Sequence, residues 1–312
     1  MSINDTKPSG AGIIFALLAY VFWGFVPLYW RFLGTAVDPL HILAFRILLS
    51  LIILTCVLLP QKKIEWLTVF KCPKKAAIRI LLSFLICANW AIFVWAIIEG
   101  RTVEASLGYY INPLVTIVLG LLFMRERLRP LQWVAVGAAT IGVLLLTILS
   151  GSVPWVALTL AFCFGFYGLV KKKYPLPALE SLGAETLVAM PFALILLGFD
   201  FSGAAGASAV FTGLQGLAYL GGIGTFSIIA LALCGAVTIF PLYCFAKSTR
   251  LLPLSTLGFM QFSSPTIIFI LGVFVFGENF PLYYFIACLF IWTAVIIYIV
   301  SLKISISPSR EK

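Results

Sequence analysis

The chain carries one apolar segment twice. Each copy has a proline at its head, a glycine at its middle and a glutamate at its tail, in Pro113-Leu-Val-Thr-Ile-Val-Leu-Gly120-Leu-Leu-Phe-Met-Arg-Glu126 and Pro265-Thr-Ile-Ile-Phe-Ile-Leu-Gly272-Val-Phe-Val-Phe-Gly-Glu278. The two copies are offset by 152 residues, which is close to half of the 312-residue chain. A repeat at this offset indicates a duplication, and a pair of similar apolar halves is typical of membrane transporters.

The composition places the chain in a membrane. Hydrophobic residues make up 62% of the sequence and charged residues 10%, with a mean hydropathy of +1.12. Apolar runs of about 18 to 25 residues follow one another, and each is long enough to cross a bilayer as a helix. A β-barrel would instead show alternating segments about ten residues long. The sequence therefore predicts a polytopic helical membrane protein.

Ten apolar runs are long enough to span the membrane. Prolines stand at many of their ends, where this residue is best tolerated. We place the helices at about residues 12–33, 40–60, 77–98, 103–124, 131–149, 153–170, 178–198, 226–246, 254–276 and 281–301. The predicted fold is an all-α membrane protein with ten transmembrane helices, built from two five-helix repeats at residues 1–150 and 151–312.

The basic residues predict how the helices are oriented. With the amino terminus in the cytoplasm, the cytoplasmic side receives Lys62, Lys63, Lys71, Lys74, Lys75, Arg79, Arg125, Arg127, Arg129, Lys171, Lys172, Lys173, Lys247, Arg250, Lys303, Arg310 and Lys312. The outer side receives Arg31 and Arg101. The positive-inside rule therefore favours this orientation, with both termini cytoplasmic. We expect the Gly- and Ala-rich stretch 202–224 to be an interfacial or re-entrant piece, or the start of the eighth helix, and not a further crossing.

An odd number of helices in each repeat inverts the second copy in the membrane. Glu126 then ends its helix on the cytoplasmic side, and Glu278 ends its helix on the outer side. The flanking Arg125 and Arg127 predict a local ion pair for Glu126. Inverted repeats are a common basis for alternating access, with solute held near the midplane between the two halves.

Two of the predicted spans carry ionisable residues, which are costly in a bilayer and therefore candidates for function. The second span holds His41 and Arg46, and its counterpart, the seventh, holds Glu180 and Glu185 at the same interval. A cationic pair facing an anionic pair across the pseudo-twofold axis would partly neutralise both. We expect Arg46 or Glu185 to line the solute path, with Glu185 the candidate for carrying a coupling proton. The alternative is structural pairing or, for His41 and Glu180, a place among the headgroups.

Polar residues near the repeated prolines give further candidates for solute binding. Pro113 and Pro265 each follow amide and hydroxyl side chains, and a proline frees a backbone carbonyl that a neighbour or a water-filled cavity must satisfy. We expect both kinked helices to face a central cavity, with contacts from Tyr110, Asn112 and Gln261.

Three other side chains complete the predicted set. Asn89 can hydrogen-bond across helices. Trp23 and Tyr167 lie deep enough in their helices to form an aromatic wall for an amphiphilic or cationic solute. Trp30 and Trp155 fit an interfacial belt better, because they stand near helix ends.

The five-helix inverted halves, each carrying Pro-x6-Gly-x5-Glu, resemble the EamA domains of the drug/metabolite transporter superfamily. The chain also resembles the RarD group, the bacterial chloramphenicol-sensitivity proteins, in Ala19-Tyr20-Val-Phe-Trp23-Gly24-Phe-Val-Pro27-Leu-Tyr29-Trp30, His41-Ile-Leu-Ala-Phe-Arg46, Glu104-Ala-Ser106-Leu-Gly108-Tyr-Tyr-Ile-Asn112-Pro113, Phe166-Tyr167-Gly168-Leu and Leu257-Gly258-Phe-Met-Gln261. This resemblance implies ten helices, a location in the bacterial inner membrane and export or exchange of small metabolites or drugs.

The sequence favours a secondary transporter of a small organic solute over the other classes considered. A nucleotide-binding Gly-x4-Gly-Lys-Ser/Thr loop is missing, so no ATPase is predicted. An anion or phosphate-ester exchanger is the alternative within transport. A membrane-embedded enzyme is the alternative from another class, and against it the sequence contains neither an HExxH nor a GxSxG motif. We predict no cofactor, no metal site and no nucleic-acid partner. The expected partners are the solute, membrane lipids and, as a candidate coupling ion, protons.

Overall fold

The structure, a computed structural model, describes residues 9–34, 37–63, 67, 71–98, 102–149, 155–200, 210–211, 224–275, 277 and 281–306. These residues form a helical bundle with one small antiparallel pair of two-residue strands, β1 (Phe199–Asp200) and β2 (Val210–Phe211). Most of the stretch 202–224, together with Glu99, Arg101 and Glu278, lies outside the described residues. The predictions for these segments stay predictions.

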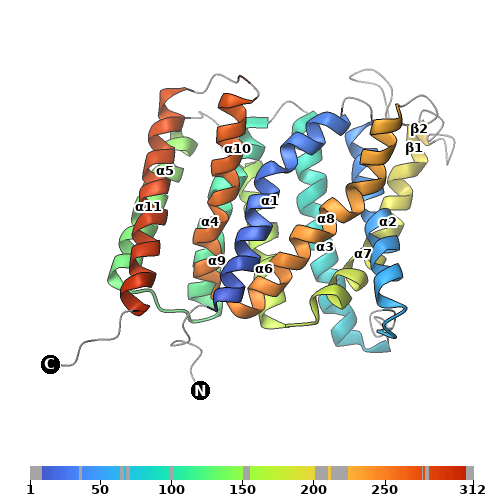
Figure 1. Cartoon of the computed structure of the whole chain (residues 1–312), viewed down its shortest axis with the longest axis horizontal. Helices are drawn as coiled ribbons and strands as arrows, with labels where there is room; N and C mark the ends of the chain where they lie inside the picture. Colours follow the sequence, from blue (N-terminus) through green and yellow to red (C-terminus); the bar gives the residue numbers. More distant parts are fainter. Residues whose placement is uncertain are drawn as a thin grey trace.

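The helices follow one another along the chain as predicted (Figure 1). Their bounds are α1 Gly10–Gly34, α2 Pro39–Leu58, α3 Pro73–Ile98, α4 Thr102–Phe123, α5 Pro130–Leu149, α6 Trp155–Lys173, α7 Ala178–Gly198, α8 Thr225–Leu251, α9 Leu254–Gln261, α10 Ser263–Phe274 and α11 Leu282–Ile306.

Ten crossings of a membrane account for these helices. Within the described residues, nine segments are long and apolar enough to span a bilayer, and α9 and α10 together form one of them. The tenth crossing is α4, whose apolar part, Leu107–Phe123, is somewhat shorter. Large apolar side chains such as Phe84, Leu122 and Ile148 are exposed on the outside of the bundle, as expected where lipid tails are the solvent. The predicted ten-helix fold is confirmed.

The helix contacts reveal the inverted repeat. If α1 to α5 correspond to α6, α7, α8, α9–α10 and α11, most helix contacts have a symmetry mate. Contact α1·α8 matches α3·α6, contact α2·α8 matches α3·α7, and contact α4·α6 matches α1·α10. The contacts α2·α7, α4·α9 and α5·α11 join equivalent helices across the pseudo-twofold axis.

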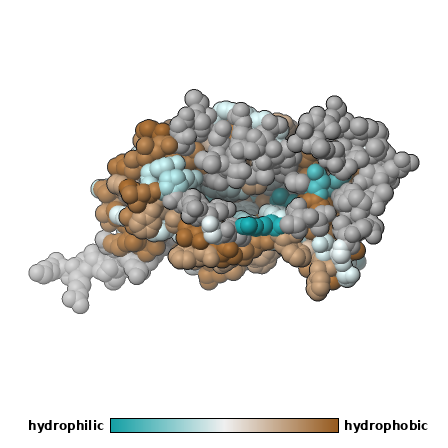
Figure 2. Space-filling view, turned by 90° about the horizontal axis from the view of Figure 1, so that it is seen from above, coloured by the Kyte–Doolittle hydropathy of each residue, from teal (hydrophilic) through white to brown (hydrophobic). Residues whose placement is uncertain are grey.

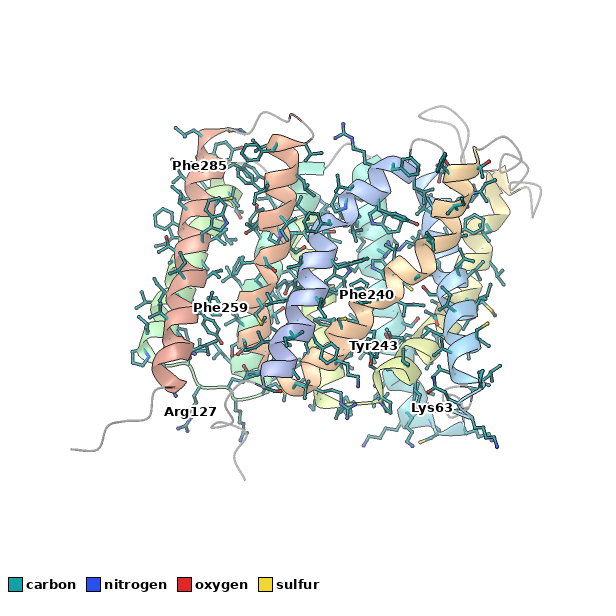
Figure 3. All side chains as sticks on the ribbon, in the orientation of Figure 1. Lys63, Arg127, Phe240, Tyr243, Phe259 and Phe285 are labelled. Carbon is teal, nitrogen blue, oxygen red and sulfur yellow. The ribbon has the colours of Figure 1, made fainter. Side chains whose placement is uncertain are left out.

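The two faces of the bundle are named here by the chain ends. Helix α1 begins and α11 ends on the same side, which we call the termini face, and the other side is the opposite face (Figure 1). Exposed basic residues such as Lys63 and Arg127 extend from the termini face (Figure 3). This asymmetry matches the predicted distribution of positive charge.

The two copies of the proline-containing helix differ in one respect. Helix α4 continues through Pro113, but the second copy, predicted as one kinked helix at 254–276, is interrupted at Phe262, between α9 and α10, within a single span. Proline lacks the N–H that would bond the carbonyl four residues earlier, which for Pro265 belongs to Gln261. The helix therefore ends at this carbonyl and restarts at Ser263.

Gly258 allows α4 and α9 to cross closely. A Cβ atom at Gly258 would lie 2.7 Å from the backbone oxygen of Pro113 and 2.6 Å from Cγ1 of Ile117. The backbone oxygen cannot move aside as a flexible side chain would. The contact between the two repeats here therefore depends on the missing side chain.

Gly258→Ala is expected to lower the melting temperature of the purified protein in detergent, because overpacking a close crossing costs about 1–3 kcal/mol. Gly137→Ala is the matched control, since Gly137 is exposed in the interior of α5 and a Cβ there meets nothing within 4 Å. The control should keep or slightly raise the melting temperature, as alanine favours a helix. Equal melting temperatures for the two variants would contradict the role given to Gly258.

Candidate functional site

Arg46 extends from α2 into the middle of the bundle. Its Nε donates a hydrogen bond to Thr238 Oγ1 of α8 at 3.1 Å. Its guanidinium carbon lies 4.8 Å from the ring centre of Trp30 in α1 and 4.3 Å from that of Trp90 in α3. Contacts with three other helices show that the side chain faces the bundle interior and not lipid, and each tryptophan contributes a favourable cation–π contact.

The end of the Arg46 side chain adjoins open space. Arg46 is partly exposed although it lies about 10 Å along α2 from the opposite face, at 1.5 Å per residue. Among the described residues, its two Nη groups make no hydrogen bond, so they remain available as donors. Figure 2 shows a hollow in the opposite face with hydrophilic residues along it. We call Arg46, Trp30, Trp90 and Thr238 the Arg46 site.

Two further aromatic pairs join α3 to α4 and α6. The ring of Tyr109 in α4 packs edge-on against Phe93 in α3, with centroids 5.8 Å apart, and is 37% exposed. Trp95 and Trp155 contact each other with centroids 5.5 Å apart, and both are exposed. These rings offer apolar surface to a flat or amphiphilic solute.

A buried ion pair joins α6 and α7 nearer the termini face. Lys171 Nζ lies 2.8 Å from Glu185 Oε1, and each side chain is only 4% exposed. Tyr167 donates a hydrogen bond to the other oxygen, Glu185 Oε2, at 2.8 Å, and Ser181 donates to Oε1. Lys171 Nζ also lies 3.1 Å from Ser181 Oγ. Both oxygens of the carboxylate are thus hydrogen-bonded, which offsets the free-energy cost of burying its charge in an apolar interior.

A small cavity lies between the Arg46 site and the ion pair. Its volume of about 20 Å³ is room for a single water molecule. The lining includes Trp90 from the Arg46 site, Tyr167 and Glu185 from the ion pair, and Cys87 between them. Residues of both groups, on α3, α6 and α7, therefore line one cavity.

Two backbone-capping contacts close the bundle at the termini face. Glu126, just after α4, accepts hydrogen bonds from the backbone N–H groups of Leu254, at 2.7 Å, and Ser255, at 2.9 Å. Lys172 donates to the carbonyls of Thr249 and Leu252 at the end of α8. The first contact caps the start of α9 and holds one repeat against the other.

Comparison with known proteins identifies the family. The model of the EamA-like transporter family matches residues 10–148. An uncharacterized transporter of Vibrio cholerae is 40% identical over 94% of this chain and 93% of its own. YojE of Bacillus subtilis, another uncharacterized transporter, is 41% identical over 86% and 87%. RarD of Salmonella typhi is 38% identical over 99% and 100%.

The chain belongs to the EamA family, in its RarD group. A solved crystal structure supports the fold independently, with a TM-score of 0.70 at 16% identity over 96% of this chain and 100% of that one. Membership of the EamA family makes the chain a multi-pass membrane transporter. The predicted resemblance is confirmed.

The predicted pairing of Arg46 with Glu185 is wrong for this EamA protein. Glu185 pairs with Lys171, and Arg46 contacts Thr238 and two tryptophans. Arg46 and Glu185 occupy equivalent positions in α2 and α7, each about 10 Å from the start of its helix. Because the repeats are inverted, equal positions lie at equal depths from opposite faces and are separated by roughly 10 Å of depth.

Three other predicted site residues, Asn89, Trp23 and Tyr167, lie in two separate parts of the bundle. Asn89 donates a hydrogen bond across helices to the carbonyl of Leu160, at 2.9 Å, as predicted. Trp23 and Tyr167 lie in one aromatic cluster, joined through Phe164 and Phe245. Of these, the described cavity is lined by Tyr167.

The residues around the repeated prolines are buried where α4 meets the second repeat. Tyr110 donates to the carbonyl of Pro265 at 3.3 Å, and Thr116 donates to the backbone carbonyl of Asn112 at 3.0 Å within one helix. Gln261 is 6% exposed, and its Oε1 has no hydrogen-bond partner within the described part of the chain. The ion pair predicted for Glu126 with its neighbours is wrong, because its carboxylate caps α9.

Sequence reasoning missed Lys171 and misassigned Trp30. The run Lys171-Lys172-Lys173 was placed after the sixth helix, but α6 extends through it. The spacing of four residues from Tyr167 to Lys171 and from Ser181 to Glu185 puts each pair on one helix face and is the pattern that indicates the network. Trp30, predicted to be interfacial, lies over Arg46.

Lys171→Met is expected to destabilise the protein by about 3–5 kcal/mol, because it leaves Glu185 buried without its counter-charge. The double variant Lys171→Met/Glu185→Leu should recover much of this loss, since both charges are gone. Thermal unfolding in detergent measures the effect. Lys173→Met is the control, because Lys173 is the last residue of α6 and is exposed. A double variant less stable than Lys171→Met would contradict the paired arrangement.

Proposed function

We propose that this chain is a secondary active transporter that moves a small organic solute across the bacterial inner membrane by alternating access, as an exporter or exchanger. The observation that carries the proposal is the Arg46 site, where a guanidinium with available Nη donors is held between two tryptophans next to open space. A fixed cation inside a membrane bundle is costly unless it serves a ligand.

The arrangement of the two faces supports alternating access. The opposite face is hollowed (Figure 2), while Glu126 and Lys172 join helix ends at the termini face. This combination corresponds to a state open on one side only. We infer that the termini face is cytoplasmic, because the exposed basic residues of the described chain concentrate there, including Lys74, Lys75 and Arg127.

The Arg46 site favours a solute with two parts. The Nη groups suit a carboxylate, phosphate or carbonyl oxygen, which a guanidinium binds through two hydrogen bonds. Trp30, Trp90 and the exposed rings of Tyr109 and Trp95 suit a flat or apolar body. A small amphiphilic metabolite or drug has both features.

The Lys171–Glu185 pair is the proposed site of proton coupling. Protonation of Glu185 would remove the charge that holds Lys171, so one proton changes how α6 and α7 are joined. The sequence has no ATP-binding loop to supply energy instead. We infer that residues 1–150 and 151–312 are the two halves that move relative to each other.

An anion or phosphate-ester exchanger is the second candidate. That class requires several cations inside the membrane, and the sequence offered Arg46 alone. The structure adds one buried basic side chain that is not ion-paired within the described residues, Arg79, which favours an anionic solute more strongly than the sequence did. Exchange and proton coupling are distinguished by whether transport needs a solute on the far side.

Comparing metabolites inside and outside cells with and without the gene identifies candidate solutes. With such a solute, Arg46→Gln should reduce transport into proteoliposomes by about 10- to 100-fold, as expected for losing a charge-assisted hydrogen bond worth about 1.5–3 kcal/mol. Arg250→Gln is the control, because Arg250 is exposed at the end of α8. Full transport by Arg46→Gln would exclude the Arg46 site as the binding site.

Glu185→Gln is expected to uncouple transport from protons. The amide keeps hydrogen-bonding capacity toward Tyr167 and Ser181 but cannot change its charge. Proteoliposomes with an imposed pH gradient should show accumulation by the wild type and only downhill equilibration by the variant. Glu180→Gln, in the first turn of the same helix, should still accumulate solute. If Glu185→Gln accumulates solute as the wild type does, Glu185 is not the coupling residue.

A further inference from the structure

Arg79 is a buried arginine whose donors are left unmet. It lies in α3, about 9 Å from the start of that helix at the termini face, and its side chain is 7% exposed. Its Nε and Nη1 are buried and have no hydrogen-bond partner among the residues that the structure describes. The sequence had assigned it to a cytoplasmic connection, so this burial was not predicted.

An unmatched buried guanidinium needs a physical explanation. Removing such a charge from water costs several kcal/mol unless a counter-charge or hydrogen bonds replace the water. Arginine cannot relieve this cost by losing its proton. The donors are therefore suited to an anion that the described residues do not supply.

Arg79 belongs to the same face of α3 as the other polar groups. The inward-facing residues Arg79, Ser83, Cys87 and Trp90 follow one another at intervals of three or four, which is one helix face. Trp90 holds Arg46, Cys87 lines the small cavity, and Ser83 donates to the carbonyl of Glu185 at 2.9 Å. The face thus leads from the Arg46 site, past the ion pair, to Arg79.

The direction of the side chain extends this route toward the termini face. Side chains on a helix lean toward its amino terminus, and α3 starts at the termini face with Pro73, Lys74 and Lys75, all exposed. Lys75 stands one turn before Arg79. The guanidinium therefore lies between the polar face of α3 and a positively charged edge.

The charges along the route do not balance. Lys171 and Glu185 cancel each other at 2.8 Å. Arg46 has two tryptophans and Thr238 but no carboxylate partner among the described residues, and Arg79 has neither. Arg46, which contacts Trp90 at one end of this face, and Arg79 at its other end are therefore both suited to an anion that passes from one to the other.

We propose that Arg79 is a second binding site for the anionic group of the transported solute, a carboxylate or phosphate, near the termini face. The proposal rests on the proposed function and adds its substrate class, an organic anion. In the state open to the opposite face the solute occupies the Arg46 site. After the bundle opens at the termini face, the anion pairs with Arg79 before it leaves. The same chemistry is found in anionic lipid headgroups, which basic pockets between helices also bind.

The test measures anion binding directly and needs no transport. Purified protein in neutral detergent is titrated with sodium benzoate and with sodium phosphate against equal ionic strength of sodium chloride, and the melting temperature is followed. The variants are Arg79→Met and Arg79→Lys in an Arg46→Gln background, which removes the first site. Lys75→Gln in the same background is the control for the loss of one positive charge.

The background variant should still be stabilised by benzoate or phosphate, and Arg79→Met should weaken the apparent affinity about tenfold or more. Arg79→Lys should retain part of the effect, and Lys75→Gln most of it. Without added anion, Arg79→Met should be at least as stable as its background, because it removes an unmatched charge. A structural arginine would show the reverse, with Arg79→Met less stable at every anion concentration, and this would overturn the proposal.

Lipid nanodiscs distinguish the two sources of anion. Stabilisation through Arg79 by phosphatidylglycerol relative to phosphatidylcholine, without any response to benzoate or phosphate in detergent, would assign the site to a lipid headgroup and overturn its assignment to solute. Failure of Arg46→Gln to reduce transport affects the proposed function alone, since the binding measurement is made without transport.

Discussion

Inversion of one repeat relative to the other is the constraint on which the rest of this structure depends. Most contacts between helices have a mate made by equivalent helices running the other way. Equivalent residues therefore lie at equal depths from opposite faces, and the two halves can carry different chemistry at the two ends of one bundle. Arg46 and Glu185 illustrate this, because one lies between tryptophans near the opposite face and the other is ion-paired near the termini face.

Sequence reasoning predicted the spans and the order of the helices well, because the thickness of the bilayer fixes the length of an apolar run and charge fixes its direction. It failed where a side chain's partner depends on rotation about the helix axis and on depth. The partner of Glu185 is Lys171, which looked like a loop residue because three lysines follow one another. A kink was predicted for both proline-containing helices, and the structure interrupts the second at Phe262 while α4 continues through Pro113.

The contacts that hold the termini face closed differ in kind from those that hold the repeats together. Glu126 bonds the first N–H groups of α9, and Lys172 bonds the last carbonyls of α8. Such end groups are also satisfied by water at the membrane surface, so exchanging one partner for the other costs little. The crossing at Gly258, with backbone against backbone inside the bilayer, has no such substitute. A change of access is therefore easier if it breaks the contacts of Glu126 and Lys172 and keeps the crossing at Gly258.

The presence of arginine at positions 46 and 79 can be explained by how charged side chains behave in an apolar interior. A lysine in an apolar interior can give up its proton, and Lys171 has a carboxylate, that of Glu185, 2.8 Å away. An arginine stays protonated everywhere in the bundle, so its positive charge always favours a nearby anion. At Arg46 two indole rings and a hydroxyl stabilise part of that charge. At Arg79, Nε and Nη1 have no hydrogen-bond partner among the described residues. In the proposed cycle an anion pairs with them only during part of transport. A cation balanced throughout would hold its partner permanently, whereas one balanced only in passing binds its ligand and then releases it.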